Sequence, residues 1–150
     1  MSELTQVINE LESRGHRLTA SRLAVLSEVY AAPDQFAAEN IHRNLPRVGR
    51  ATVFRTIKLL VDESILCRVL LDDGRLLYRW SRQGHHHHLV CKSCGAVRDL
   101  SGCGVEALLA DALEAVGFSM DGHWLEVYGH CEVCRSQSRV ATAEAPARTA

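Results

Sequence analysis

The sequence lacks any apolar run long enough to cross a bilayer. Its longest apolar runs are a few residues, such as Val69-Leu70-Leu71, against the roughly 20 residues that a membrane helix needs. The first residues also lack the basic stretch followed by an apolar one that marks a secretory signal. We therefore expect a cytoplasmic protein with no membrane partner. With 47% apolar and 23% charged residues, the 150-residue chain should form one or two small globular domains.

The chain also lacks a general excess of positive charge, because its formal net charge is −1. This balance argues against a uniformly basic nucleic-acid binder. The charges are unevenly distributed, however: residues 14–58 carry eight Lys or Arg against three Asp or Glu, whereas residues 81–150 carry six against eight. The N-terminal part of the chain could therefore bind a polyanion, and the C-terminal part could not.

Helical periodicity dominates the first half of the chain. Apolar residues recur at helical spacing from Leu4 onward, and Gly15 should end this first helix. Thr19 is a plausible N-cap for a second helix that Pro33 ends. A short third helix is expected from about Ala37 to Leu45.

A fourth helix should begin near Arg50 and be amphipathic. Its apolar residues fall on one stripe, which is Val53, Ile57, Leu60 and Val61. At 100° per residue this stripe leaves Ala51, Arg55 and Lys58 on the opposite face, with Phe54 at the border. The exposed face is therefore basic.

Two strand-like runs follow, residues 66–71 and 75–80, joined by Asp72-Asp73-Gly74. Asp-Gly between apolar runs indicates a hairpin. Several helices followed by a hairpin is the order of a winged helix-turn-helix, which places its last helix in the DNA major groove. Many α+β domains also begin with helices, so this order alone does not identify a DNA-binding module.

Residues 81–84 are the best candidate for a linker. We expect an α+β protein with a winged helix over residues 1–80, a hinge over 81–84, an α/β domain over 85–134 and a mobile tail over 135–150. In the second domain, strands are expected near 88–91 and 96–100, a helix up to Gly117, and one or two strands within 118–128. About fifty residues cannot bury much core, so this domain should need a metal or a partner chain.

Two C-x-x-C pairs are the strongest chemical signal. Cys91 and Cys94 form one pair, Cys131 and Cys134 the other, and each lies near a glycine. Two intervening residues let both sulfurs bind one tetrahedral ion, and two such pairs supply a closed four-cysteine shell. Redox pairs or unliganded thiols are the alternatives, but structural zinc is favoured in a reducing compartment.

Four consecutive histidines, His85-His86-His87-His88, precede the first pair. In a strand, successive side chains point to opposite faces, so His85 and His87 would feed one metal site and His86 and His88 another. The alternative is a solvated polar run. Each pair needs further ligands, and the residues alone leave the choice open among Cys67, Asp99, Cys103, Glu106, His123 and His130.

These motifs resemble the ferric uptake regulator (Fur) family of bacterial metal-responsive repressors, over nearly all of residues 10–134. The matching segments are Arg17-Leu18-Thr19-Ala20-Ser21-Arg22, Ala51-Thr52-Val53-Phe54-Arg55-Thr56-Ile57, His85 to Gly95, Gly117-Phe118 and Leu125-Glu126-Val127-Tyr128-Gly129-His130-Cys131. Tyr78-Arg79, with the histidine run and Leu89-Val90-Cys91, looks most like the zinc uptake regulators of that family.

The resemblance implies three metal sites in a chain whose second domain dimerises. Cys91, Cys94, Cys131 and Cys134 match the family's structural zinc site. A further site in the dimerisation domain is matched by His85, His87, Glu106 and His123. The sensing site between the two domains is matched by His86 and His88.

The sensing site is where this sequence departs from its relatives. Zinc-sensing relatives usually have Asp at the position of Cys67 and Cys at that of Ser81, so in this chain the thiol has moved to Cys67 and a hydroxyl takes the second position. Iron- and peroxide-sensing relatives instead use a His near Gln35 and an acidic residue near Arg79, and this chain has neither. A thiolate with two imidazoles favours zinc over iron(II) or manganese. We therefore expect Cys67, His86 and His88 to bind zinc, with Asp99, Cys103, Ser81 or a water molecule as the fourth ligand.

The resulting hypothesis is a zinc-sensing repressor of metal-uptake genes, a homodimer that binds palindromic double-stranded operator DNA. The candidate DNA contacts are Arg17, Arg22, Thr52, Phe54, Arg55 and Lys58. Phe54 stands where the family usually has Tyr, so a hydroxyl contact is lost while a thymine methyl remains within reach. An iron-, manganese- or peroxide-responsive relative is the nearest alternative.

Two alternatives come from other protein classes. A zinc hydrolase or deaminase could use Glu106 as a general base, but the chain has neither H-E-x-x-H nor H-x-E with P-C-x-x-C. A metal buffer would not need the basic amphipathic helix at 50–63. We therefore expect a regulator and not an enzyme.

Overall fold

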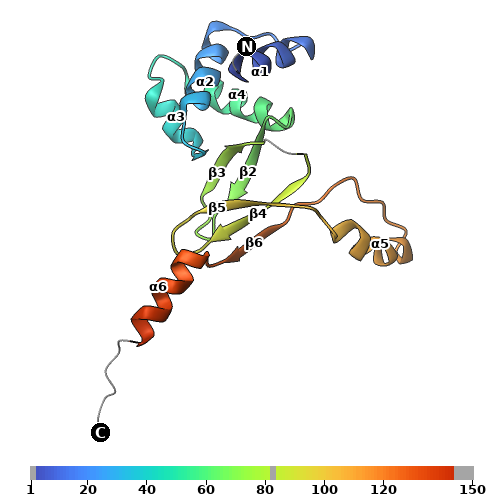
Figure 1. The fold of residues 1–150 in the computed structure, drawn as a ribbon. Coiled ribbons are helices and arrows are strands. Elements are labelled where there is room, and N and C mark those ends of the chain that lie inside the picture. Colours follow the sequence, from blue (N-terminus) through green and yellow to red (C-terminus); the bar gives the residue numbers. More distant parts are fainter. Residues whose placement is uncertain (1–2, 82–83, 144–150) are drawn as a thin grey trace. The chain divides into compact units, whose positions relative to one another are not determined.

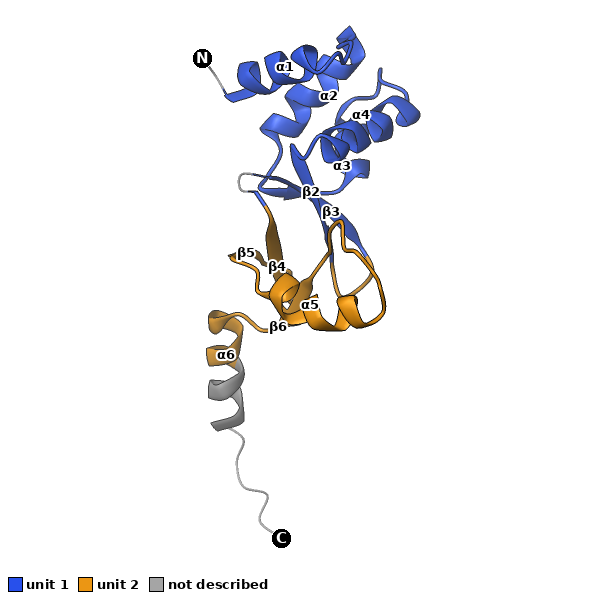
Figure 2. Cartoon of the chain, turned by 90° about the vertical axis from the view of Figure 1, so that its right-hand side faces the viewer, with its two compact units in different colours: residues 1–70, 75–84 blue, residues 71–74, 85–150 orange. Residues whose placement is uncertain are grey.

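The computed structural model describes residues 3–81 and 84–143 (Figure 1). Within these ranges the chain forms two compact units, coloured separately in Figure 2. Unit 1 holds residues 3–70, 75–81 and 84, and unit 2 holds residues 71–74 and 85–143. Residues 82 and 83 of the expected hinge lie outside the described ranges. None of the described helices is long and apolar enough to span a bilayer.

Four helices make up most of unit 1, and they are α1 (Glu3–Ser13), α2 (Ala20–Ala31), α3 (Ala38–Asn44) and α4 (Arg50–Asp62). The end of α1 and the start of α2 follow from local sequence. Gly15 has φ +86°, a left-handed conformation that glycine adopts freely after a helix. The Thr19 side chain accepts a hydrogen bond from the Arg22 backbone N–H at 3.4 Å and so caps α2, as predicted.

The core of unit 1 forms where α2 and α4 pack against each other. Val25, Leu26 and Val29 of α2 are fully buried, and so are Val53, Ile57 and Leu60 of α4. The apolar stripe predicted for α4 is therefore confirmed, and burying each such side chain contributes roughly 1.5–3 kcal/mol. The opposite face of α4 carries Arg55 and Lys58 and is exposed.

The hairpin after α4 is the expected wing. Strands β2 (Leu66–Leu70) and β3 (Leu76–Trp80) pair antiparallel, with Cys67 opposite Arg79. Gly74, at φ +83°, allows the tight turn between them. A short strand not expected from the sequence, β1 (Gln35–Phe36), adds to β3 and gives the order β1-β3-β2. The helices and this sheet form a winged helix-turn-helix.

Unit 2 is built on a three-stranded sheet with the order β5-β4-β6. The central strand β4 (His86–Cys91) pairs antiparallel with β5 (Val97–Ser101) and parallel with β6 (Glu126–Gly129). Helix α5 (Val105–Ala115) lies in the connection between β5 and β6. The fold class is therefore α+β, with a winged helix followed by a smaller α/β unit.

One strand, β6, forms where one or two strands were expected within 118–128, and residues 118–125 complete the long connection from α5 back to the sheet. Residues 135–143 of the expected mobile tail belong to helix α6 (Glu132–Ala143). This helix starts inside the second C-x-x-C pair, where the Ser136 hydroxyl donates to the Glu132 carbonyl at 3.1 Å. Residues 144–150 lie outside the described ranges.

Unit 2 has almost no apolar core of its own. Among its described residues, the buried apolar side chains are Leu71, Val90 and Cys91, and no residue of α5 is buried. Of the thirteen large apolar side chains that are exposed in the described ranges, ten lie in unit 2 and three in unit 1. The expectation that this short segment cannot bury a core is confirmed.

Candidate functional site

The two C-x-x-C pairs come together at one end of the unit 2 sheet. Cys91 ends β4, and a turn with Gly95 at φ +71° brings the chain back toward β5. Parallel pairing of β4 with β6 then places Cys131 beside this turn. The four sulfurs of Cys91, Cys94, Cys131 and Cys134 lie within 4.8 Å of one another. We call this group the cysteine cluster.

The cysteine cluster fits a tetrahedral zinc ion. Zn–S bonds of about 2.3 Å place neighbouring sulfurs about 3.8 Å apart, and the sulfurs of Cys94 and Cys131 are 3.9 Å apart. All six cysteines of the chain are free thiols, so no disulfide competes for these residues. The four ligands leave no open position for a substrate, which indicates a structural site.

The backbone of the cysteine cluster favours thiolates. The Cys131 N–H donates to the Cys91 sulfur at 3.3 Å, and this contact, with backbone N–H groups of Cys94 and Ser93, lowers the pKa of Cys91 to about 6. Hydrogen bonds from neighbouring thiols raise the pKa of Cys134 to about 12. Four thiolates cannot accumulate without a cation, so metal uptake must release protons.

The four consecutive histidines divide between two faces of β4, as predicted. The rings of His85 and His87 lie 4.7 Å apart on one face, and those of His86 and His88 lie 5.1 Å apart on the other. His87 and His88 are buried. Burial, followed by the charges of neighbouring histidines, lowers the pKa of His87, so its imidazole is neutral, the form that binds metals.

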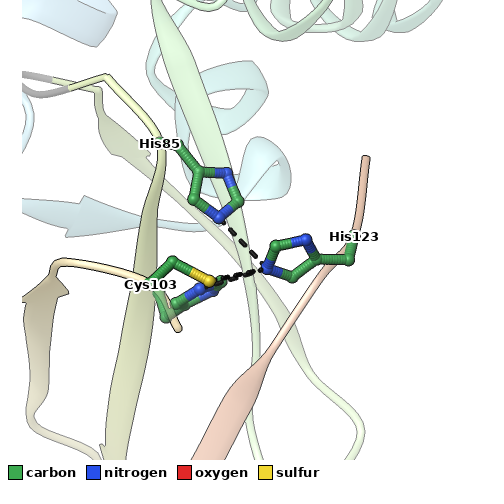
Figure 3. A group of neighbouring side chains, drawn as sticks. His85, Cys103 and His123 are labelled. Carbon is green, nitrogen blue, oxygen red and sulfur yellow. Dashed lines mark hydrogen bonds between the residues drawn. The ribbon is translucent and has the colours of Figure 1, made fainter. Parts of the chain in front are cut away.

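His85 and His87 meet His123 and Cys103, and we call these four residues the Cys103 cluster. Figure 3 shows His85, Cys103 and His123 pointing toward one another. His123 Nε2 lies 3.1 Å from His85 Nε2, 3.3 Å from His87 Nε2 and 3.1 Å from the Cys103 sulfur. Neighbouring ligand atoms of a tetrahedral zinc site with nitrogen and sulfur donors lie about 3.3–3.6 Å apart, so the cluster is suited to one ion.

The fourth member of this cluster is Cys103, whereas Glu106 is not part of it. Glu106 was expected to join His85, His87 and His123, and Cys103 was a candidate for the other histidine pair. Glu106 is instead exposed in the first turn of α5, while the turn before that helix directs Cys103 inward. Gly102 at φ +84° makes this turn possible. The spacing along the chain could not distinguish two ligand-capable residues three positions apart.

His86 and His88 have a neighbour that the sequence did not indicate. Parallel pairing places Glu126 of β6 beside His88, with 3.9 Å between Glu126 Oε1 and His88 Nδ1. The Tyr128 hydroxyl donates to the other Glu126 oxygen at 2.8 Å. Burial, followed by this carboxylate, raises the pKa of Tyr128 to about 12, so the hydroxyl keeps its proton. At 3.9 Å the carboxylate acts on His88 through its charge and not through a hydrogen bond.

The other candidates for the sensing site are distributed over both units. Cys67 lies in β2 of unit 1, where its thiol donates to the Arg79 carbonyl at 3.6 Å. Ser81 follows β3, and its N–H donates to the Ile65 carbonyl at 2.9 Å. Asp99 of β5 is the antiparallel partner of His88 in unit 2. His130 is not a member of any cluster found among the described residues.

A separate group of side chains gives unit 1 a positively charged hollow. It has a volume of about 320 Å³, and its lining residues are Arg17, Thr19, Arg22, Thr52 and Arg55. The Arg22 guanidinium donates to the Arg17 carbonyl at 2.8 Å, which holds the segment before α2 in place. Guanidinium groups and hydroxyls on one surface suit phosphate oxygens and base edges.

Two of the candidate DNA contacts lie outside this hollow. Phe54 is half-buried against the unit 1 core, and the Arg50 guanidinium carbon lies 4.6 Å from its ring centre. The Lys58 ammonium pairs with Asp62 one turn later, at 2.6 Å. Arg55 therefore projects from α4 into the hollow while Lys58 is already paired with a carboxylate of its own helix.

The profile of the ferric uptake regulator family matches residues 13–128. The chain belongs to the ferric uptake regulator family. Its curated relatives include the ferric uptake regulation protein of Shigella flexneri, 33% identical over 127 residues, which are 81% of this chain and 85% of that protein. The zinc uptake regulation protein of Mycobacterium tuberculosis is also 33% identical, over 130 residues that cover 84% of this chain and all of that protein.

Solved structures of the family support the fold. The ferric uptake regulator from Francisella tularensis with iron superposes with a TM-score of 0.61 at 26% identity, covering 81% of this chain and 96% of that one. A zinc uptake regulator complexed with zinc and DNA gives a TM-score of 0.71 over 91% of this chain and 95% of that one, at 23% identity. As a ferric uptake regulator family member, the protein is a metal-responsive transcription regulator and not an enzyme.

Proposed function

We propose that this protein is a zinc-responsive repressor that binds palindromic operator DNA as a homodimer and controls metal-uptake genes. The observation that carries the choice of metal is the donor set. Cys67 offers a thiolate and His86 and His88 offer imidazoles, which favour zinc over iron(II) and manganese. An operator-binding role also places the protein in the cytoplasm, with the chromosome.

We assign one structural and one regulatory role to zinc. The cysteine cluster would hold the structural ion, since its shell is closed by four sulfurs. The regulatory ion would be shared by Cys67 of unit 1 with His86 and His88 of unit 2. Zn²⁺ supplies no redox chemistry at such sites and acts as a cross-link between side chains.

The regulatory mechanism is a population shift. Cys67 and the two histidines belong to different units, so they can share one ion only when the units adopt a restricted set of orientations. Zinc binding therefore selects those orientations in each protomer. In a dimer, this selection spaces the two α4 helices for successive major grooves of a palindromic operator. Glu126, which accepts a hydrogen bond from Tyr128, places its negative charge 3.9 Å from His88 Nδ1, and this charge would favour a cation at His88.

The homodimer follows from the missing core of unit 2. A second copy has the same exposed apolar side chains, so a symmetric pairing covers both sets at once. Leu108 of α5 and Val116, which caps the C-terminus of that helix, are 79% and 75% exposed although both are apolar. Covering such side chains contributes about 25 cal/mol per Å² of apolar surface.

The test is a DNA selection followed by a gel shift. The protein is first used to select duplexes from a random-sequence library with zinc present. Binding of the protein to the recovered duplex is then measured by gel shift at fixed salt, with buffered zinc, iron(II) or manganese or with no metal. We expect saturable DNA binding that requires metal, and we expect zinc to support it at a lower free-metal concentration than iron(II) or manganese. A shift that responds to iron(II) or manganese but not to zinc would reassign the sensed metal, and a metal-independent shift would refute the switch.

Replacing Arg55 with alanine should weaken operator binding by about 10- to 100-fold, the effect expected for losing a base-contacting arginine. The change removes an exposed side chain from α4, so zinc content and folding should be unchanged. Fluorescence anisotropy of a labelled operator at fixed salt measures this effect.

Lys58→Ala is the matched control for Arg55→Ala. Lys58 lies one turn away on the same exposed face, but Asp62 already pairs with it. We expect a loss of affinity of no more than about 3-fold, as for a single phosphate contact weakened by a competing ion pair. If both substitutions weakened operator binding equally, Arg55 would contribute to that binding only through its positive charge.

A further inference from the structure

The connection between α1 and α2 is tied to the C-terminal end of α4 by one carboxylate. Glu63 caps the C-terminus of α4, and its side chain is 20% exposed. One carboxylate oxygen accepts a hydrogen bond from the Arg14 guanidinium at 2.6 Å, and the other lies 2.7 Å from His16 Nε2. Arg14 also donates to the Glu63 backbone carbonyl at 3.2 Å. Glu63 therefore holds two residues of the connection at the end of α4.

These contacts explain why a carboxylate is tolerated at this end of α4. The C-terminus of a helix carries a partial negative charge, so an acidic side chain there is destabilising unless a cation accompanies it. The Arg14 guanidinium supplies that cation, and it also bonds a carbonyl at the helix end, where carbonyls lack partners within the helix. The hydrogen bonds from Arg14 and then from His16 hold the pKa of Glu63 below its usual value, so its carboxylate is ionised at neutral pH.

The end of α4 is itself a fixed point of unit 1. The Ile65 N–H donates to the Leu60 carbonyl at 2.8 Å across the turn that follows the helix, and both side chains are buried in the unit 1 core. Ser64, within this turn, has φ +59°, a left-handed conformation that a non-glycine residue keeps only where surrounding contacts enforce it. Glu63 therefore presents its carboxylate from a rigid backbone.

From Glu63 the connection leads into the positively charged hollow. Arg17 follows His16, is exposed, and lines the hollow together with residues of α4. On its C-terminal side, Leu18 packs against the unit 1 core and the Arg22 guanidinium donates to the Arg17 carbonyl. On its N-terminal side, the contacts to Glu63 hold the chain. If those contacts were lost, Arg17 would have to lose more conformational freedom when it binds DNA.

We propose that Glu63 is a positioning residue for DNA binding: by holding Arg14 and His16 at the end of α4, it sets Arg17 beside Arg55 before DNA is bound. The proposal rests on the DNA-binding role of the proposed function. The sign of the effect separates positioning from charge. A carboxylate near a phosphate-binding surface repels DNA, so its removal strengthens binding if it acts through charge alone. Removal of a positioning residue weakens binding instead.

Hydrogen exchange tests, without DNA, whether Glu63 holds the connection. The N–H groups of residues 14–16 donate to carbonyls of α1, so their exchange rates report how often the connection opens. Exchange into the zinc-loaded full chain is followed by mass spectrometry, with peptides of α4 as the internal reference. Glu63→Ala should exchange about 10-fold faster at residues 14–16, the effect of freeing about one backbone residue. Unchanged exchange there would overturn the proposal.

DNA affinity tests the consequence for binding. The probe is the duplex recovered by the selection described above, titrated at several salt concentrations with saturating zinc. Glu63→Ala should weaken binding about 10-fold and lower the slope of log Kd against log salt concentration by about 1, as when one phosphate contact is lost. Glu12→Ala removes an exposed carboxylate of α1 and is the matched control, which should bind no more weakly than the native protein. Unchanged or stronger binding of Glu63→Ala would overturn the proposal.

A double-mutant cycle identifies the side chain through which Glu63 acts. In an Arg17→Ala background, Glu63→Ala should weaken binding by no more than about 2-fold, because the side chain that it positions is already absent. The same 10-fold loss in both backgrounds would show that Glu63 supports the fold in general, which contradicts the proposal.

His16 provides a test of the hydrogen bond itself. His16→Gln keeps a side-chain N–H that can donate to Glu63, whereas His16→Ala does not. We expect His16→Gln to bind the duplex within about 2-fold of the native protein and His16→Ala to bind about 5-fold more weakly. Equal losses for the two substitutions would contradict the role of this contact.

The proposed function and this proposal fail in different ways. Metal-independent binding of the selected duplex by the native protein would refute the zinc switch, while the comparison of Glu63→Ala with the native protein at saturating zinc would still decide the role of Glu63. Zinc-dependent binding that is equally tight in the native protein and in Glu63→Ala would refute the positioning role alone. If the native protein bound no duplex, both would fail.

Discussion

Replacing Cys67 with serine is expected to abolish zinc-dependent operator binding while the cysteine cluster keeps its zinc. A serine hydroxyl stays protonated at neutral pH and is a poor zinc ligand, so His86 and His88 would lose the partner that unit 1 supplies. We expect operator affinity with zinc to fall about 100-fold, to the level of the metal-free native protein. Anisotropy titrations at fixed salt and buffered zinc, paired with zinc analysis, measure both effects.

Cys67→Asp is the matched control for this substitution. Aspartate offers a charged oxygen ligand, the donor that zinc-sensing relatives are expected to have at this position. It should restore most of the zinc response, with a weaker preference for zinc over manganese because the thiolate is gone. A normal zinc response of Cys67→Ser would show that the thiol is not a ligand and would leave the proposed switch without a contribution from unit 1.

Replacing Cys94 with serine should have the largest effect on stability. Cys94 is exposed, so replacing its side chain creates no cavity. Any change in stability therefore reflects the loss of a metal ligand. Structural zinc contributes roughly 10–16 kcal/mol to the folding of small zinc domains, and unit 2 has too small a core to compensate. We expect loss of the cysteine-cluster zinc, loss of the folded unit 2 and loss of dimerisation.

Calorimetry and sedimentation would follow these changes. Unit 1 should keep its own unfolding transition, because its core of α2 and α4 does not involve the cysteine cluster. Ser93→Ala is the matched control: it changes the neighbouring side chain but keeps the backbone N–H that faces Cys91. A dimeric Cys94→Ser protein with an unchanged unit 2 transition would show that the cluster is not structural.

The sequence alone determined the features that depend on near neighbours along the chain. The stripe of α4, the Thr19 cap and the Asp72-Asp73-Gly74 turn each follow from residues a few positions apart, as does the division of the four histidines between two faces. The four cysteines could be grouped because each C-x-x-C pair is itself a local metal-binding turn. The family resemblance extended these observations to a winged helix and three metal sites.

Only the tertiary structure decided which distant residues meet. Parallel pairing of β4 with β6 sets Glu126 beside His88, and the turn at Gly102 selects Cys103 over Glu106. Likewise, the packing of α2 on α4 unites Arg17 with Arg55. Periodicity specifies the face on which a side chain lies, whereas strand order, register and turn direction specify its neighbour. Strand order, register and turn direction arise from the packing of whole elements, so they could not be predicted from the spacing of residues along the sequence.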